Sequence, residues 1–152
     1  MDEMSDVERL VAIEDIKLLK SRRDRAVDMK DWATFEALHA PEHRSHNDGY
    51  EPWNSAAELV ANVKKALEGV TTIHHSHTPD ITFQSRAKAN GIWAMEDNLY
   101  WMQGDQEHWL HGYGFYYETY EKRKGQWVFT TRQLKRICVK TSPGAVFGPK
   151  KP

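Results

Sequence analysis

The stretch GVTTIHHSHTP, residues 69–79, marks the point where the pattern of the chain changes. Before Gly69 the apolar residues recur at helical spacing, and after it they alternate with polar residues in a period of two. The same stretch places three of the eight histidines within four positions, at His74, His75 and His77. We therefore expect an α+β domain in which helices come first and then cover one face of a curved antiparallel sheet.

Two helices are expected at the beginning of the chain. Ser5 and Glu8 form a capping box, in which each side chain can bind the free backbone N–H of the other residue, and a long helix should follow over residues 6–29. Asp31 should begin a second, short helix that ends before Pro41, because proline excludes the preceding residue from helical geometry.

A short strand and a third helix should separate these helices from the sheet. Polar alternation over residues 43–50 and the Asn47-Asp48-Gly49 turn signal predict a short edge strand. A second capping box, from Ser55 to Glu58, begins a helix that Gly69 should close as the residue after the cap.

Together with the edge strand before Gly69, the alternation after Gly69 predicts a sheet of about five to six strands. The predicted strands lie at residues 71–77, 79–85, 88–103, 106–122 and 126–140. Gly104-Asp105 and Lys124-Gly125 are turn signals that should join the last three strands as antiparallel hairpins. We expect one domain over residues 1–152, with an irregular tail at 142–152.

Composition excludes several classes of function. The 152 residues carry a formal net charge of -1 and no basic run apart from Lys150-Lys151, so we expect no nucleic-acid partner. The acidic N-terminus and the lack of a long apolar run predict neither a signal peptide nor a membrane span. The single cysteine, Cys138, excludes an internal disulfide and favours a reducing, cytoplasmic location. Six Trp, six Tyr and five Phe suit a core or a pocket for a flat ligand.

The histidine stretch has three interpretations. One histidine that faces the interior could act as a general base, since imidazole exchanges a proton near neutral pH and a carboxylate can orient it. The stretch could equally be an exposed polar strand end. A zinc site with His39, His43 or His46 is the third possibility, but no recognised ligand spacing is present.

Acidic and basic residues offer partners for such a histidine. Asp28 lies where the apolar stripe of the first helix should meet the sheet, so its carboxylate needs a partner. Asp97 shares a strand face with Trp93, Met95, Leu99 and Trp101. Among these side chains its pKa should rise, so that it could donate a proton, although a plain salt bridge is the alternative. Arg136 lies in a moderately apolar strand and needs an anion, such as Asp97 or a substrate oxygen, unless it is exposed.

Two further groups of residues are a charged run in the first helix and an aromatic strand face. The run Lys20-Ser21-Arg22-Arg23-Asp24-Arg25 predicts a solvated, charged helix face. An alternating strand face consists of Trp109, His111, Tyr113, Phe115 and Tyr117. This face predicts either ordinary sheet core or the aromatic wall of a pocket.

Taken in order, these motifs resemble the SnoaL-like branch of the NTF2-like superfamily. The matching residues are Asp28, Trp32, His74, His77-Thr78-Pro79, Trp93, Glu96-Asp97, Tyr117, Tyr120-Glu121, Gly125-Gln126-Trp127 and Arg136. Within that branch the chain is most similar to the bile-acid 7α-dehydratases, and more distantly to scytalone dehydratases and hexachlorocyclohexane dehydrochlorinases. The resemblance implies a cone-shaped sheet whose helices enclose a pocket, a catalytic His74 held by Asp28, and Asp97 and Arg136 lining the pocket. Arg23 stands where the dehydratases have a catalytic tyrosine and the dehydrochlorinases have a cation.

The sequence thus predicts a cofactor-independent lyase, dehydratase-like, or an isomerase, acting on a hydrophobic ring-containing molecule of the steroid, terpenoid or aromatic polyketide class. His74 would remove a proton, a protonated Asp97 would assist the departing oxygen, and Arg23 or Arg136 would neutralise developing charge. The expected substrate-binding residues are Trp93, Tyr113, Tyr117 and Trp101. The alternative is a non-catalytic NTF2-like module that binds a small molecule or a partner protein. The resemblance also implies a homotrimer, and no metal or other cofactor is expected.

Overall fold

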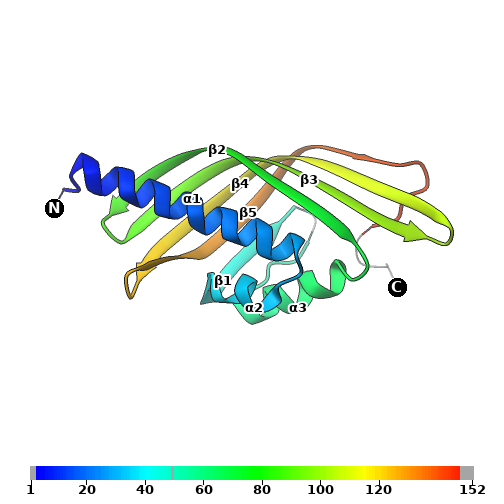
Figure 1. The fold of residues 1–152 in the computed structure, drawn as a ribbon, viewed down its shortest axis with the longest axis horizontal. Helices are drawn as coiled ribbons and strands as arrows, with labels where there is room; N and C mark the ends of the chain where they lie inside the picture. Colours follow the sequence, from blue (N-terminus) through cyan, green and yellow to red (C-terminus); the bar gives the residue numbers. More distant parts are fainter. Residues whose placement is uncertain (1–2, 49, 148–152) are drawn as a thin grey trace.

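A computed structural model describes residues 3–48 and 50–147 and confirms the α+β class. Its elements are α1 (Asp6–Asp28), α2 (Trp32–Ala37), β1 (His39–Asn47), α3 (Ala56–Ala66), β2 (Thr71–Ser85), β3 (Lys88–Gln103), β4 (Gln106–Arg123) and β5 (Gln126–Thr141). The five strands form one curled, unclosed sheet in the order β1-β5-β4-β3-β2 (Figure 1). All pairs are antiparallel except β1 with β5, which run parallel.

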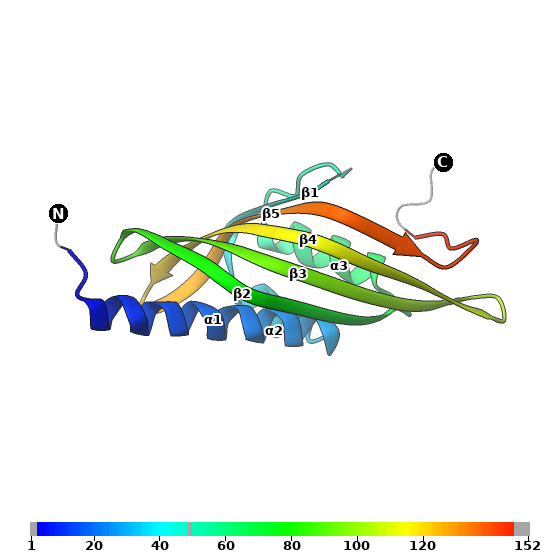
Figure 2. The ribbon, with the colours of Figure 1, turned by 90° about the horizontal axis from the view of Figure 1, so that it is seen from above.

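The helices lie against one side of this sheet. Figure 2 shows α1 running alongside β2, the edge strand, while α2 and α3 lie together near β1 in Figure 1. The capping box predicted at Ser5 is present: its hydroxyl accepts from the Glu8 N–H, and Glu8 Oε2 accepts from the Ser5 N–H at 2.8 Å. At the third helix Ser55 caps as expected, but Glu58 reaches the N–H of Asn54 instead.

The predicted break between two strands at Thr78-Pro79 is wrong. Residues 71–85 form one strand, β2, and the register shifts by one residue between Ser76 and Pro79, which pair with Met95 and Trp93. A β-bulge therefore absorbs the proline, which cannot donate to the sheet. Gly49 of the expected Asn47-Asp48-Gly49 turn lies outside the described residues.

The two predicted turns set the faces of the sheet. Gln103 pairs with Gln106 across Gly104-Asp105, so every odd-numbered β3 residue lies opposite an even-numbered β4 residue, and Asp97 lies opposite Gly112. Lys124 and Gly125 both adopt positive φ, as a two-residue type I′ hairpin turn requires. The inner face of β4 therefore carries Gly112, Gly114, Tyr116, Glu118 and Tyr120.

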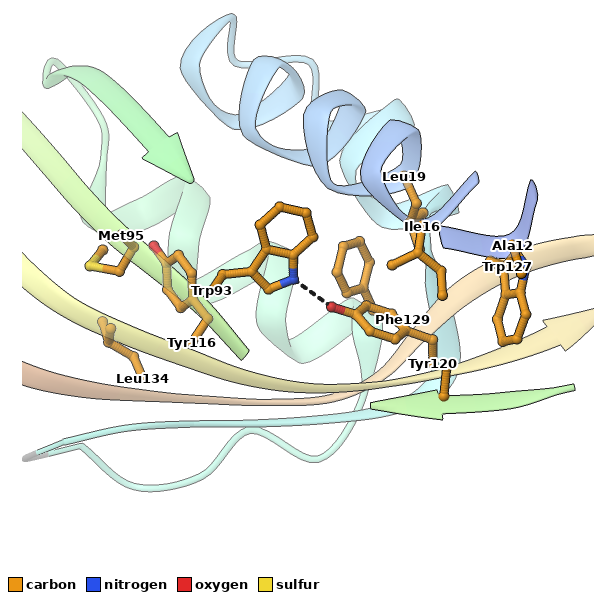
Figure 3. Packing of buried hydrophobic residues seen from close by; sticks show 11 residues of the cluster. Ala12, Ile16, Leu19, Trp93, Met95, Tyr116, Tyr120, Trp127, Phe129 and Leu134 are labelled. Carbon is orange, nitrogen blue, oxygen red and sulfur yellow. Dashed lines mark hydrogen bonds between the residues drawn. The ribbon is translucent and has the colours of Figure 1, made fainter. Parts of the chain in front are cut away.

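Two hydrophobic clusters hold the helices to the sheet. The first joins α1 to the inner face of the sheet, and Figure 3 shows it with Trp93 Nε1 donating to the Tyr120 hydroxyl at 2.7 Å. The second lies beneath α2 and α3 and includes Phe35, Leu59 and Leu99. Within the described ranges, no helix is long and apolar enough to cross a membrane. Residues 142–147 are irregular, and the remainder of the predicted tail lies outside the described residues.

Candidate active site

Asp28 and His74 meet at the end of α1. Asp28 is the last residue of the helix, and His74 lies on the adjacent edge strand β2. The carboxylate accepts three hydrogen bonds: from the His74 ring at Nδ1 (2.7 Å), from the His74 backbone N–H (2.8 Å) and from the Thr72 hydroxyl (2.9 Å). Both side chains remain partly accessible, at 23% for Asp28 and 12% for His74. The sequence-predicted pair is thus within hydrogen-bonding distance.

These contacts favour the charged form of Asp28 and determine which nitrogen of a neutral His74 ring carries the hydrogen. Burial raises the pKa of Asp28, but the hydrogen bonds and charge of His74 outweigh it, and the net pKa is lowered. A carboxylate only accepts, so Nδ1 of His74 carries the hydrogen. The lone pair then resides on Nε2 whenever the ring is neutral, which is the state that a general base requires.

Asp97 is not the proton donor that the sequence suggested. It is buried directly opposite His74 in the β2–β3 register, and it binds Arg136 through two hydrogen bonds, of 2.9 and 2.8 Å. Burial raises the pKa of Asp97, but the Arg136 guanidinium more than compensates and the net pKa falls below its ordinary value. The expectation of a raised pKa is therefore wrong, because the apolar face contains an arginine from a strand 39 residues away.

Gly112 provides the space for the ion pair between Asp97 and Arg136. This role of Gly112 was not predicted from the sequence. A Cβ built at Gly112 would overlap Nη1 of Arg136 and Oδ1 of Asp97. The glycine lies opposite Asp97 on β4, so the guanidinium can lie across the sheet directly over its backbone. A glycine opposite a candidate site carboxylate across a predicted hairpin is the sequence signal that could have revealed this space.

We expect Gly112→Ala to lower the free energy of unfolding by about 2 kcal/mol, since a methyl group in this space forces the buried pair apart. Urea denaturation monitored by Trp fluorescence measures the effect. Tyr113→Phe, a change at the neighbouring exposed position, should stay within about 0.5 kcal/mol. Equal stability of Gly112→Ala and wild type would contradict the described geometry.

A second polar cluster lies deeper in the fold. The predicted solvated face of α1 is wrong at Lys20, Arg23 and Asp24, which are all buried. Lys20 forms an ion pair with Glu118 on β4, which also lies 3.8 Å from Nε of Arg132. Lys20 lies 4.0 Å from the centre of the Tyr116 ring, and burial lowers its pKa to about 8. This cluster thus holds three cations (Lys20, Arg23 and Arg132) and two carboxylates (Asp24 and Glu118).

Arg23 belongs to this deeper cluster. Its Nε donates to Nε2 of His39 at 3.1 Å, and its guanidinium lies over the rings of Phe35 and Phe129. It is 2% exposed and its described contacts do not include Asp28 or His74. Arg136, in contrast, binds Asp97, which lies opposite His74 in the β2–β3 register.

Two buried histidines of this cluster should make stability depend on pH. Burial lowers the pKa of His43 to about 4 and that of His39 well below its ordinary value. Below pH 6.5 the unfolded chain takes up protons that the folded chain refuses, so stability should fall as the pH falls. Between pH 7 and pH 5 each histidine should contribute a loss of about 2 kcal/mol. Urea denaturation at both pH values should show a smaller loss for His43→Phe, and an unchanged loss would contradict a neutral buried His43.

The expected substrate-binding aromatics are dispersed. Tyr113 and Tyr117 lie on the outer face, 40% and 38% exposed, so they are not part of the sheet core, and Tyr117 lines a groove on that face. The cause is the hairpin register, which pairs them with Glu96 and Ile92 rather than with Asp97. Trp93 is part of the hydrophobic core. Trp101 is half-buried, its ring centroid 5.3 Å from that of Phe147.

The remaining histidines of the stretch lie on the outer face. His75 and His77 both approach Glu96, at 3.2 and 3.5 Å, and are more than half exposed. In the part of the chain that the structure describes, no group of three or more His, Cys, Asp or Glu residues could hold a metal ion. A groove of about 630 Å³ crosses this outer face, and Ser45, Glu118 and Arg132 also contribute to its lining, whereas His74 does not.

Known proteins share this architecture. The SnoaL-like domain family matches residues 8–133, and the chain therefore belongs to the SnoaL-like family. Hexachlorocyclohexane dehydrochlorinase LinA type 2 superposes with a TM-score of 0.81 at 21% identity, over 96% of this chain and 99% of that one. A scytalone dehydratase-like protein from Novosphingobium aromaticivorans gives 0.82 at 19% identity, over 96% and 97%. LinA type 3 from Novosphingobium barchaimii gives 0.75 at 23%, over 95% and 99%. At these identities the likeness establishes an NTF2-like fold.

Proposed function

We propose that this protein is a cofactor-independent lyase, dehydratase-like, or an isomerase that acts on a hydrophobic ring-containing small molecule of the steroid, terpenoid or aromatic polyketide class. The observation that carries the proposal is the 2.7 Å hydrogen bond from His74 Nδ1 to Asp28. The family and its structural neighbours, which include a dehydrochlorinase, support chemistry of this type.

In the proposed elimination, Nε2 of His74 removes a proton from a carbon next to an activating group. The electron pair of that C–H bond becomes the new C=C bond. The C–O bond breaks with its pair going to oxygen, which leaves as hydroxide, and the proton held by His74 and this hydroxide together make up the water that is lost. Asp28 stabilises the imidazolium that forms. Arg136 faces the charge that develops on oxygen, and the ionised Asp97 holds the guanidinium in place through two hydrogen bonds.

The test is proton exchange and elimination with a panel of cyclic β-hydroxyketones in D₂O. An active enzyme should produce conjugated enones, seen by ultraviolet absorbance, and should introduce deuterium next to the carbonyl, seen by NMR. Heat-inactivated protein is the control. The absence of both signals over a panel of steroid, terpenoid and polyketide frameworks would count against the proposal.

A non-catalytic binding module is the second candidate, and one observation favours it. Trp93, Tyr116 and Tyr120 are nearly fully buried and fill the inner part of the fold between α1 and the sheet (Figure 3). Such filling leaves less room for a ligand near the pair. If ring compounds bind without exchange or elimination, the binding module becomes the better description.

We also propose that the protein is a cytoplasmic homo-oligomer, a trimer by its resemblance to trimeric enzymes. Exposed apolar side chains on the outer sheet face support assembly, among them Ile92 and Tyr117 beside the groove. Native mass spectrometry at micromolar concentration should show a trimer, and Ile92→Glu should dissociate it by placing a charge at the interface. Lys124→Glu, at the β4–β5 turn, is the control and should leave the trimer intact. A monomeric wild type would contradict assembly.

A further inference from the structure

One row of polar side chains on β1 has no role in the chemistry proposed above. From His43 to Asn47 the more buried and the exposed positions of β1 alternate, so His43, Ser45 and Asn47 face inward while Arg44 and His46 face outward. His43 is fully buried, Ser45 is 3% exposed, and Asn47 at the strand end is more accessible. We call these three inward residues the β1 polar row.

Each residue of the β1 polar row has a buried atom without a hydrogen-bond partner. Among residues 3–48 and 50–147, no partner is found for His43 Nε2, Ser45 Oγ or Asn47 Oδ1. Arg132, opposite Ser45 on β5, adds an unpartnered Nε, since Glu118 at 3.8 Å is too far for a hydrogen bond. Buried polar atoms of native proteins are nearly always satisfied, so the three atoms of the row and the neighbouring Arg132 Nε would bind either ordered water or a polar group of a ligand.

The donors and acceptors at the β1 polar row define the chemistry of the ligand group that could bind there. His43 Nδ1 lies 3.1 Å from the carbonyl oxygen of Phe129. A carbonyl only accepts, so Nδ1 carries the hydrogen and Nε2 presents a lone pair. The row therefore offers two acceptors (His43 and Asn47) and a hydroxyl (Ser45) that can donate or accept, and the neighbouring Arg132 adds one donor. A carboxylate or ketone only accepts and would leave His43 unsatisfied, whereas an alcohol or phenol both donates and accepts.

The β1 polar row continues to the Asp28–His74 pair. Asn47 is followed by Asp48, whose carboxylate accepts the backbone N–H of Arg136 at 3.3 Å. Arg136 in turn binds Asp97, which lies opposite His74. The row thus begins in the interior, and its more exposed end is linked to His74 through Asp48, Arg136 and Asp97.

We propose that the β1 polar row is a substrate-binding subsite that takes a hydroxyl group on the ring system of the ligand. The substrate class is then a hydroxylated ring compound, whose hydroxyl donates to His43 or Asn47 and accepts from Arg132. This assignment of a substrate rests on the proposed function, but the recognition of a hydroxyl group by the row can be tested by binding alone.

The experiment uses the full chain carrying His74→Ala, so that no ligand is converted. Titration calorimetry compares 2-naphthol with 2-methoxynaphthalene, which accepts but cannot donate, and with 2-naphthoate. We expect naphthol to bind about tenfold more tightly than either analogue, as one buried hydrogen bond warrants. If only water satisfies the row, the three probes should bind equally, which would overturn the proposal. So would a lack of naphthol binding at millimolar concentration.

Variants then place the preference on the row. His43→Phe and Asn47→Leu remove the two acceptors, and at least one of these variants should reduce the naphthol preference to about threefold or less. His46→Ala, the outward-facing residue between them, is the matched control and should keep it. A preference that survives both inward variants would overturn the assignment. Should either variant fail to fold, the location of the naphthol oxygen in a crystal of the His74→Ala complex decides, and an oxygen away from His43, Ser45 and Asn47 contradicts the subsite.

The two proposals fail in different ways. If the wild type shows no elimination but prefers naphthol through the row, the proposed reaction is wrong and the subsite stands. If elimination depends on His74 while the naphthol preference is absent, the reaction stands and the subsite is wrong.

Discussion

Replacing Glu118 with Gln should lower the free energy of unfolding by about 3–5 kcal/mol, the range found when one partner of a buried ion pair is removed. Glu118 is 2% exposed, forms an ion pair with the buried Lys20, and accepts the Tyr120 hydroxyl at 2.7 Å. Without its charge, Lys20, Arg23 and Arg132 would remain in the interior without the carboxylate that interacts with all three of them. Urea denaturation should show the loss as a lower midpoint.

Two further variants test the cause. The exposed pair Lys17–Glu14, at 2.7 Å, is the matched control, and Glu14→Gln should change stability by less than about 1 kcal/mol. The double variant Lys20→Met with Glu118→Gln should recover part of the loss, because it removes the unneutralised cation as well. Equal effects at Glu118 and Glu14 would contradict a buried ion pair.

Replacing His74 with Ala should reduce turnover of any substrate found by at least about 10³-fold, since the proposed base is removed. The melting temperature should change by only a few degrees, because the side chain is not part of either hydrophobic cluster and Thr72 and the backbone N–H still bind Asp28. Steady-state kinetics and thermal denaturation measure the two effects.

His75→Ala is the matched control for this prediction, as it removes the neighbouring imidazole from the exposed outer face. It should leave kcat within about twofold of wild type. Retention of activity in His74→Ala would exclude a catalytic His74, and a collapse of its stability would assign the residue a structural role.

Local signals predicted much of this fold. The Ser5 cap, the switch at Gly69 and the two glycine turns are encoded within a few residues, and the helices and hairpins follow from them. The Asp28–His74 contact could also be predicted, because each of these residues is expected where the first helix meets the sheet. The parallel pairing of β1 with β5 could not be predicted from local signals, since it joins residues as far apart in sequence as His39 and Phe129.

The missed features depend on partners distant in sequence. Asp97 was expected to be protonated because its strand neighbours are apolar, but Arg136 comes from another strand and reverses the shift. Lys20 and Arg23 were assigned to solvent by their charge, although they follow the buried Ile16 and Leu19 at helical spacing. Tyr113 and Tyr117 were placed by alternation alone, and only the hairpin register shows which face is inner.

The position of Asp28 has a consequence for self-association. β2 is an edge strand, and an unpaired backbone N–H at an edge can recruit a strand from another molecule. Asp28 occupies the N–H of His74 in place of such a strand. The carboxylate that orients the imidazole therefore also removes one of the free donors that such a strand would need, so selection for either property would preserve the other.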